Sequence, residues 1–449
     1  MVYTAGTVTV SNGVSAAAGL QFATNGYTVT GSTITLAGAD AASNTITTDA
    51  GVTATIDSQL SGTAGLTKAG AGTLTLGGAN DYTGGTVVSA GELAGSTTSL
   101  QGNVTNNAVL RFSQTTNGTY GGAITGTGSL VKAGTGTVTL TGANAPDAGT
   151  LISEGGLQIG DGGANGSLSG VITNNGALIV DRTGVLTLSN VISGTGTFTK
   201  AGNGTVTLTA ANTFSGTATV AAGALRLGSA AGNVLAGDVE IAGGTLNYST
   251  TTDHQIADTA DITMTSGAFE VGSRSETVTS LTMSGGTLSK SGGALTFSGA
   301  SSVTGGTVTI DTTTATLSFG GALTLGAATF DYTSTSGTAN NTAVVLGGDV
   351  TTTGSGTTTF SKALGGNPFL DLGDASRTLD VVAGTTVDID WGVRDGSLVK
   401  AGNGTLILSS AANVQSGTTL SAGVLRAGAD AALGSGGVTL NGGTVSSDD

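Results

Sequence analysis

Aliphatic residues alternate with threonine in short runs along the whole chain. Leu74 and Leu76 are separated by one threonine, and so are Val138 and Leu140. A period of two is typical of a β-strand with one buried face and one solvated face. Glycine and asparagine bracket these runs and supply the positive φ angles that sharp corners require. The pattern predicts short strands joined by tight corners.

One segment of this kind is present in four clear copies, the first reading GLTKAGAGTLTLGGANDYTGGTVVSAGEL. The copies occupy residues 65–93, 128–157, 196–225 and 396–425. Such repetition indicates a solenoid. Antiparallel hairpins would favour two-residue Asn-Gly or Asp-Gly loops, whereas these corners are irregular and rich in glycine. We therefore expect one continuous domain over residues 1–449, an all-β, single-stranded parallel β-helix of about twenty rungs.

Lysine recurs at one position of the segment, at Lys68, Lys132, Lys200 and Lys400. The spacing corresponds to whole numbers of coils of about 20 to 23 residues. Because it persists between Lys200 and Lys400, we expect the less regular middle of the chain to keep a similar coil length. Residues 285–310, GGTLSKSGGALTFSGASSVTGGTVTI, repeat the pattern directly.

The composition predicts a folded chain with a polar but weakly charged surface. Charged residues make up 9% and hydrophobic residues 38% of the 449 residues, so threonine, serine and asparagine must supply the solvated face. No run approaches the roughly 20 apolar residues of a membrane-spanning helix. The net charge of −15, with 13 dispersed Lys and Arg residues, argues against nucleic acid and anionic lipid as partners. The absence of cysteine excludes disulfides and thiolate sites.

The four copies, beginning with LTKAGAGTLTLGGANDYTGGTVVSAGEL at residues 66–93, together with the lead-in GVTATIDSQLSG at residues 51–62, resemble the passenger-associated transport repeat of autotransporters. These are the type V secreted proteins of Gram-negative bacteria. The resemblance implies a right-handed β-helical passenger, exported through the outer membrane by a C-terminal β-barrel, and an extracellular or cell-surface location. The signal peptide and the barrel of the family pattern are absent from this sequence, so we expect a segment of a larger protein.

The best acidic cluster is VDIDWGVRDG, which contains Asp388, Asp390 and Asp395. Paired carboxylates can bind Ca²⁺ or act as the acid and base of a glycosidase. The EF-hand spacing is absent and the nonapeptide Ca²⁺ repeat is not matched. We interpret the cluster as a solvated corner, with the three aspartates as weak metal candidates.

Other polar positions favour structural roles. Asn80, Asn144, Asn212 and Asn413 recur in the copies and are predicted to close tight turns and to stack as hydrogen-bonded ladders. The sole histidine, His254, is interpreted as a loop residue without chemistry, because metal sites and triads need several converging groups. Glycine-rich strings precede strands, not helices, so no phosphate or other cofactor site is expected. No catalytic residue is predicted.

These observations predict a non-enzymatic extracellular passenger with a structural or adhesive function. Two alternatives stay open: a self-assembling subunit of a fibre or surface layer, and a carbohydrate-active β-helix enzyme. Expected partners are a host-surface, matrix or carbohydrate ligand. End-to-end self-association is a further expectation, because the sequence starts and stops inside the repeating pattern.

Overall fold

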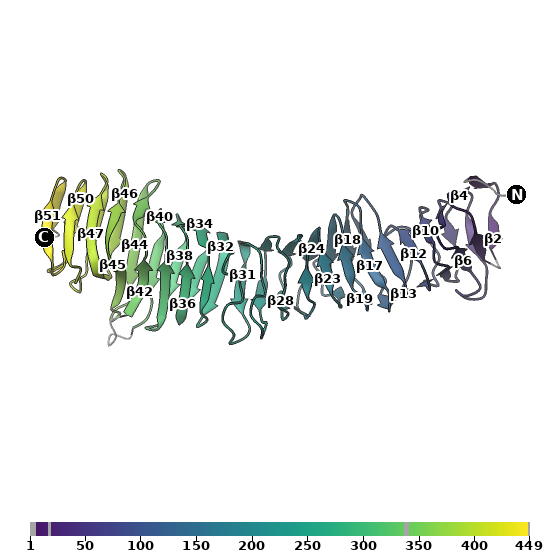
Figure 1. Cartoon of the computed structure of the whole chain (residues 1–449), viewed down its shortest axis with the longest axis horizontal. Coiled ribbons are helices and arrows are strands. Elements are labelled where there is room, and N and C mark those ends of the chain that lie inside the picture. Colours follow the sequence, from purple (N-terminus) through teal and green to yellow (C-terminus); the bar gives the residue numbers. More distant parts are fainter. Residues whose placement is uncertain (1–5, 17–18, 336–340, 448–449) are drawn as a thin grey trace. The chain divides into compact units, whose positions relative to one another are not determined.

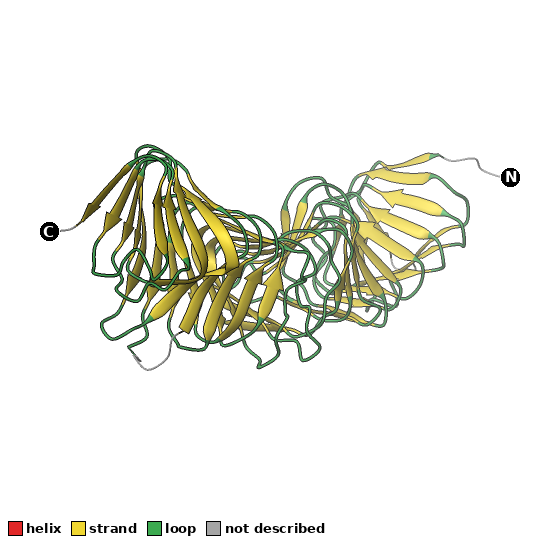
Figure 2. Ribbon diagram, turned by 60° about the vertical axis from the view of Figure 1, so that its left-hand side comes forward, coloured by secondary structure: helices red, strands yellow, loops and turns green. Residues whose placement is uncertain are grey.

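The computed structural model describes residues 6–16, 19–335 and 341–447. Parallel strands are stacked as a β-solenoid of about 22 turns, and the described residues contain no helix (Figure 2). The predicted all-β parallel β-helix of about twenty rungs is therefore confirmed, whereas its right hand stays a prediction. No helix in the described ranges is long and apolar enough to cross a membrane.

The chain divides into two compact units. The first contains Met1–Val206 and Asn212–Gly216, and the second contains Thr207–Ala211 and Thr217–Asp449. Figure 1 shows the strands of each unit in sequence order. A single unbroken domain over residues 1–449 stays a prediction.

In the first unit, strands of successive coils pair in parallel and form long sheets. A ten-stranded sheet contains β1 (Thr7–Val10), β4 (Tyr27–Gly31), β7 (Thr53–Ile56), β10 (Thr73–Leu76), β12 (Glu92–Gly95), β14 (Val109–Phe112), β17 (Ser129–Lys132), β20 (Thr150–Ile152), β23 (Ile172–Asn174) and β26 (Ile192–Ser193). An eight-stranded sheet contains β3 (Leu20–Phe22), β6 (Thr45–Thr48), β9 (Leu66–Ala69), β11 (Thr86–Val88), β13 (Val104–Asn106), β16 (Ile124–Gly126), β19 (Ala143–Pro146) and β22 (Ser167–Leu168).

Two shorter ladders complete the coils of this unit. One consists of β2 (Val14–Ala16), β5 (Ile34–Leu36) and β8 (Leu60–Ser61). The other consists of β15 (Gly118–Tyr120), β18 (Thr137–Leu140), β21 (Gly156–Ile159), β24 (Ala177–Val180) and β27 (Thr197–Lys200). Strands β25 (Val185–Leu188) and β28 (Thr205–Leu208) follow the same alternation.

The core of the first unit is built from like residues stacked on like residues. Leu74 pairs with Leu93, Leu93 with Leu110, and Leu110 with Leu130. All four side chains are fully buried. Burying one such side chain contributes about 1.5 to 3 kcal/mol, so each added coil extends the core without a new packing solution.

The second unit is organised as three parallel ladders. The first runs through β29 (Ala218–Val220), β31 (Val239–Tyr248), β32 (Asp261–Gly272), β34 (Ser280–Met283), β37 (Ser301–Val303), β40 (Leu323–Leu325), β43 (Val350–Thr352) and β45 (Pro368–Asp380). The second runs from β30 (Ala224–Leu227) through β31 and β32 to β35 (Thr287–Lys290), β38 (Thr307–Ile310), β41 (Thr329–Tyr332), β44 (Gly356–Lys362), β46 (Thr385–Ile389), β48 (Thr405–Leu408), β50 (Val424–Ala427) and β52 (Thr444–Ser447). The third contains β33 (Glu276–Val278), β36 (Gly293–Phe297), β39 (Ala315–Phe319), β42 (Asn341–Leu346), β45, β47 (Gly392–Ala401), β49 (Gly417–Leu420) and β51 (Gly437–Leu440).

Aromatic rings fill the interior of this unit. Phe330 and Phe360 stack with ring centroids 4.5 Å apart, and Phe360 meets Trp391 edge to face at 5.2 Å. Phe330 pairs with Phe360 on the neighbouring coil. These ring contacts add to the stabilisation that burial of the side chains provides.

Candidate functional site

Lysine side chains point into the interior of the coils. Lys68 is fully buried, and its ammonium donates hydrogen bonds to the carbonyl oxygens of Ala69 at 2.9 Å, Gly70 at 2.8 Å and Ala90 at 3.1 Å. The first two carbonyls belong to the corner that follows the lysine, and the third belongs to the next coil. An ammonium has three N–H donors, so this arrangement uses all of them.

Similar arrangements recur at Lys132, Lys200 and Lys400 in the other copies of the repeat and at Lys290 outside them, and we call each one a lysine cage. Lys132 donates to Ala133, Gly134 and Glu154, and Lys400 donates to Ala401, Gly402 and Ala422, at 2.7 to 3.1 Å. Lys200 donates to the carbonyl oxygen of Gly202, and Lys290 donates to those of Gly272, Arg274 and Gly292. The cages of Lys68, Lys132, Lys290 and Lys400 join a corner of one coil to a neighbouring backbone segment.

The pKa values of the caged ammonium groups are compatible with a structural role for the charged lysines. Burial lowers the pKa of the Lys68 and Lys400 ammonium groups to about 8. Both therefore remain mostly protonated at pH 7. Because the carbonyl oxygens occupy the donors, these lysines are not available as bases or nucleophiles at neutral pH.

Sequence reasoning used these lysines only as markers of spacing and missed their burial. The signal was present: Lys68 follows buried Leu66 by two residues, so strict alternation places its side chain on the inward face. A lysine on an inward strand position followed by Ala-Gly is the local pattern in all four copies.

The recurring asparagines form bridges between coils. Asn80 accepts a hydrogen bond from Leu60 N at 2.7 Å and donates to the carbonyl oxygen of Ser99 at 2.7 Å. Asn413 does the same with Val393 N at 2.7 Å and Ala432 O at 2.5 Å. The remaining two accept from the backbone of the preceding coil: Asn144 from Ile124 N and Asn212 from Ile192 N.

All four asparagines are buried, and none has a positive φ angle. Their side chains hold backbone groups of neighbouring coils, and Asn144 also donates to the carbonyl oxygen of Gly142, two residues before it, at 2.8 Å. Turn closure and stacked ladders of these asparagines stay predictions. Buried backbone groups away from the ladders need such partners, because an unmet donor or acceptor costs free energy.

The acidic residues of the 388–395 stretch point to different partners. Asp388 lies on the outward face of β46 and accepts a hydrogen bond from Ser409 Oγ at 3.4 Å. Asp390 pairs with Lys362 at 3.1 Å. Asp395 pairs with Arg394 at 2.9 Å, beside Asp371.

Trp391 lies in the same stretch, after Asp388 and Asp390 and before Asp395. It is fully buried and donates from its indole N–H to the carbonyl oxygen of Ser361 at 2.7 Å. Within the described ranges, no group of three or more His, Cys, Asp or Glu residues has the geometry to hold a metal ion.

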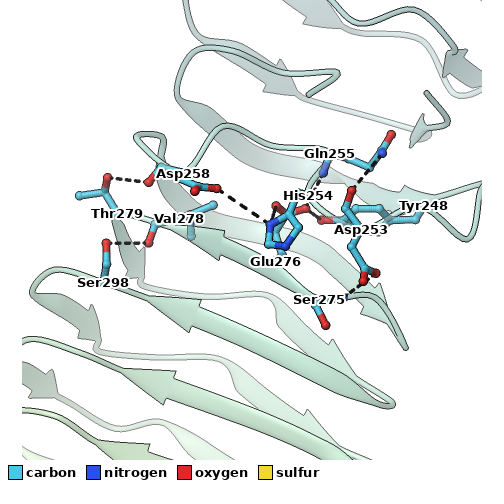
Figure 3. A network of polar contacts seen from close by, with 10 residues as sticks. All are labelled: Tyr248, Asp253, His254, Gln255, Asp258, Ser275, Glu276, Val278, Thr279 and Ser298. Atoms are coloured by element: carbon cyan, nitrogen blue, oxygen red, sulfur yellow. Dashed lines mark hydrogen bonds and ion pairs between the residues drawn. The ribbon is translucent and has the colours of Figure 1, made fainter. Parts of the chain in front are cut away.

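A buried carboxyl group lies next to the sole histidine (Figure 3). Glu276 is 1% exposed, and its Oε2 accepts hydrogen bonds from the Tyr248 hydroxyl at 2.8 Å and from Gln255 N at 3.0 Å. His254, with a φ of 53°, places Nδ1 3.9 Å from Oε1 of Glu276 and 4.0 Å from Oδ1 of Asp258. Burial raises the pKa of Glu276 to about 7.

Glu276 was not singled out in the sequence, although it occupies an inward position of a strand. His254 lies in a loop, as expected, and faces this carboxyl group. Through its contacts with Tyr248, Gln255 and His254, the buried Glu276 carboxyl group connects separate backbone segments of the second unit.

Comparison with known proteins identifies the repeated segment. The passenger-associated-transport-repeat family model matches residues 66–94, 130–159, 198–227 and 398–427, where the lysine cages of Lys68, Lys132, Lys200 and Lys400 lie. The chain is also 33% identical over 234 residues to the adhesin BmaC autotransporter of Brucella suis biovar 1 (strain 1330). Over these regions the chain is similar to the passenger repeats of autotransporters.

The matched region covers 44% of this chain but only 7% of the length of the Brucella protein. No solved structure matches the segment.

Proposed function

We propose that this passenger segment is a non-enzymatic adhesive part of a surface protein, and that it binds a ligand on a host surface, in the matrix or on a carbohydrate. The observation that carries the proposal is the 33% identity to a protein named an adhesin, over a region of 234 residues. The repeated coils supply a regular polar surface on which binding groups can be displayed.

The inward polar residues support a structural use of the repeat. The lysine cages and the asparagine bridges place their polar atoms against backbone groups of the same or neighbouring coils. The aspartates at 388, 390 and 395 contact separate partners. These side chains therefore supply no converged acid, base and nucleophile of the kind that hydrolysis requires.

A binding assay tests the proposal. Purified segment, labelled at its N-terminus, is titrated onto monolayers of mammalian epithelial cells and onto immobilised matrix proteins, with heat-unfolded segment as the control. We expect saturable binding of the folded segment with a Kd below about 10 μM. Equal binding of folded and unfolded segment, or no saturation, would overturn the adhesive function.

The alternatives are distinguished in the same preparation. Light scattering over a concentration series reports assembly into fibres, and release of reducing ends from polysaccharides reports glycosidase activity. Turnover of a polysaccharide that is lost on heat unfolding would contradict a non-enzymatic function.

A further inference from the structure

A cleft of about 470 Å³ lies on the second unit beside β31 and β32. Besides Thr and Ser residues like those on the other outward faces, its lining contains charged, amide and aromatic side chains. The side chains that give the cleft its chemistry are an amide, two carboxylates, a guanidinium and a hydroxyl, with one aromatic residue beside them: Asn247, Glu270, Asp311, Arg274, Ser289 and Tyr248.

A β-bulge forms one side of the cleft. Glu270 pairs with Ser289, and Gly272 pairs with Lys290, so Val271 is an extra residue without a partner in the register. Its side chain is fully buried. Gly272 has a φ of 60°, a left-handed conformation that favours glycine. Bulges redirect the chain locally, and here Gly272 to Arg274 line the cleft instead of continuing the flat face.

Hydrogen bonds to backbone carbonyl groups hold this side of the cleft. The Lys290 ammonium is 1% exposed and donates to the carbonyl oxygen of Gly272 at 3.1 Å and to that of Arg274. The guanidinium of Arg274 donates to the carbonyl oxygen of Thr251 at 2.7 Å. The wall is therefore held in place by two cations that are bonded to backbone.

Hydrogen bonds also hold Asn247 and Tyr248, on the β31 side of the cleft, in place. Asn247 Nδ2 donates to Glu270 Oε2 at 3.1 Å, and the Tyr248 hydroxyl is bonded to Glu276. The amide oxygen of Asn247 is buried and has no hydrogen-bond partner in the described part of the chain. Groups that are positioned before binding lose little conformational entropy when a ligand arrives.

The chemistry of the lining selects one class of ligand. The two carboxylates outnumber the single guanidinium, which disfavours an anion. Metal ions are disfavoured as well, since no group of three ligating side chains converges among the residues described. Sugar hydroxyls both donate and accept hydrogen bonds, which matches a lining of amide, carboxylate, guanidinium and serine groups.

We propose that this cleft is a binding subsite for a neutral saccharide. The proposal rests on the adhesive function proposed above and names the ligand class of that function. Asn247, Glu270 and Arg274 hydrogen-bond the sugar hydroxyls, and Tyr248 supplies the aromatic contact.

The test uses the purified full chain and a panel of neutral oligosaccharides of glucose, galactose, mannose and N-acetylglucosamine. Sialyllactose serves as the anionic comparison, and saturation-transfer NMR detects binding. We expect at least one neutral probe to bind with a Kd below about 5 mM and sialyllactose to bind more weakly. Stronger binding of sialyllactose would overturn the assignment of a neutral ligand.

Matched variants locate the site. Glu270→Ala and Arg274→Ala are expected to weaken binding by about tenfold or more. Glu240→Ala, on the outward face of β31, and Arg426→Ala, on β50, are expected to stay within about twofold of the parent chain. Circular dichroism melting of each variant confirms folding, and Asn247→Asp provides a further cleft variant if Arg274→Ala fails to fold.

The outcomes separate this proposal from the adhesive function. If no neutral probe binds while the folded segment still binds cells saturably, the saccharide subsite is wrong and the adhesive function stands. If the control variants lose binding as much as the cleft variants do, the site lies elsewhere. If both cell binding and saccharide binding are absent, both proposals are wrong.

Discussion

The Lys68 ammonium lies 2.8 Å from the carbonyl oxygen of Gly70, two residues further along the chain. Gly70 has a φ of 73°, and this left-handed conformation belongs to the corner whose carbonyl groups receive the lysine. A Cβ atom at Gly70 would overlap the carbonyl oxygen of Thr48 on the preceding coil. The lysine and the glycine therefore act together: one supplies the donors, and the other permits the corner.

Removing the ammonium should destabilise the first unit. In Lys68→Met the carbonyl oxygens of Ala69, Gly70 and Ala90 lose their donor while the aliphatic volume is kept. We expect the free energy of unfolding to fall by about 2 to 4 kcal/mol, measured by urea denaturation. Arg226→Met, an exposed position in the second unit, is the control and should change it by less than about 0.5 kcal/mol. A loss of similar size in both variants would show that the cage contributes no specific stability.

Substitution of two glycines should distinguish the cost of backbone strain from the cost of steric overlap between coils. Gly70 and Gly51 have similar φ angles, 73° and 75°, but a Cβ at Gly51 would meet nothing within 4 Å. We expect Gly51→Ala to cost about 1 kcal/mol and Gly70→Ala to cost about 3 kcal/mol or more, since the coil spacing must also change. Thermal melting monitored by circular dichroism measures both, and equal costs would contradict the role of close coil contact.

A buried asparagine bridge should contribute more to the free energy of unfolding than an exposed one. Asn80→Ala leaves Leu60 N and Ser99 O without their partner in a buried setting, and we expect a loss of about 2 to 3 kcal/mol. Asn103→Ala removes an exposed hydrogen bond to Ala123 N, which water can replace, and should cost less than about 1 kcal/mol. Urea denaturation of the two variants provides the comparison, and the reverse order of stabilities would refute the bridging role.

Stability of the second unit should fall as pH rises between about 4.5 and 7. Burial raises the folded-state pKa of Glu276 from the ordinary 4.5 to about 7, so the folded state binds the proton more tightly than the unfolded state does. The stabilisation is complete below about pH 4.5 and is lost as pH rises through 7, with an upper magnitude of about 3 kcal/mol.

Glu276→Gln should flatten this dependence and raise the melting temperature at pH 8, because a neutral amide carries no burial penalty for charge. Glu240→Gln, at a half-buried outward position of β31, is the control and should leave the pH profile unchanged. Melting curves from pH 4 to 8 measure both. An unaltered slope in Glu276→Gln would assign the dependence to another group.

Calcium should have little effect on the second unit. Asp388 and Asp390 contact Ser409 and Lys362, respectively, and the Asp390 side chain is 44% exposed. Exposed carboxylates contribute little to stability, so the double variant Asp388→Asn, Asp390→Asn should shift the melting temperature by no more than about 2 °C, with or without Ca²⁺. A rise on adding Ca²⁺ that the double variant lacks would demonstrate a metal site.

The sequence by itself determined the fold class and the repeat. Alternation of period two, as at Leu74 and Leu76, is a local signal that fixes which face of a strand is buried. Positive φ at a corner is likewise a property of one glycine such as Gly70. Since each coil repeats the same local rules, parallel stacking follows without knowledge of distant contacts. The family resemblance of the four copies followed from the same residues.

Only the tertiary structure decided which polar groups meet. The partner of Asn80 is a backbone amide 20 residues away, and Glu276 meets His254 and Tyr248 from different coils. The bulge at Val271 depends on a register between two strands, which no single strand reveals. These contacts depend on coil length to within one residue, and hydrophobic alternation does not specify that length, because one more residue in a glycine-rich corner leaves the pattern of each strand intact.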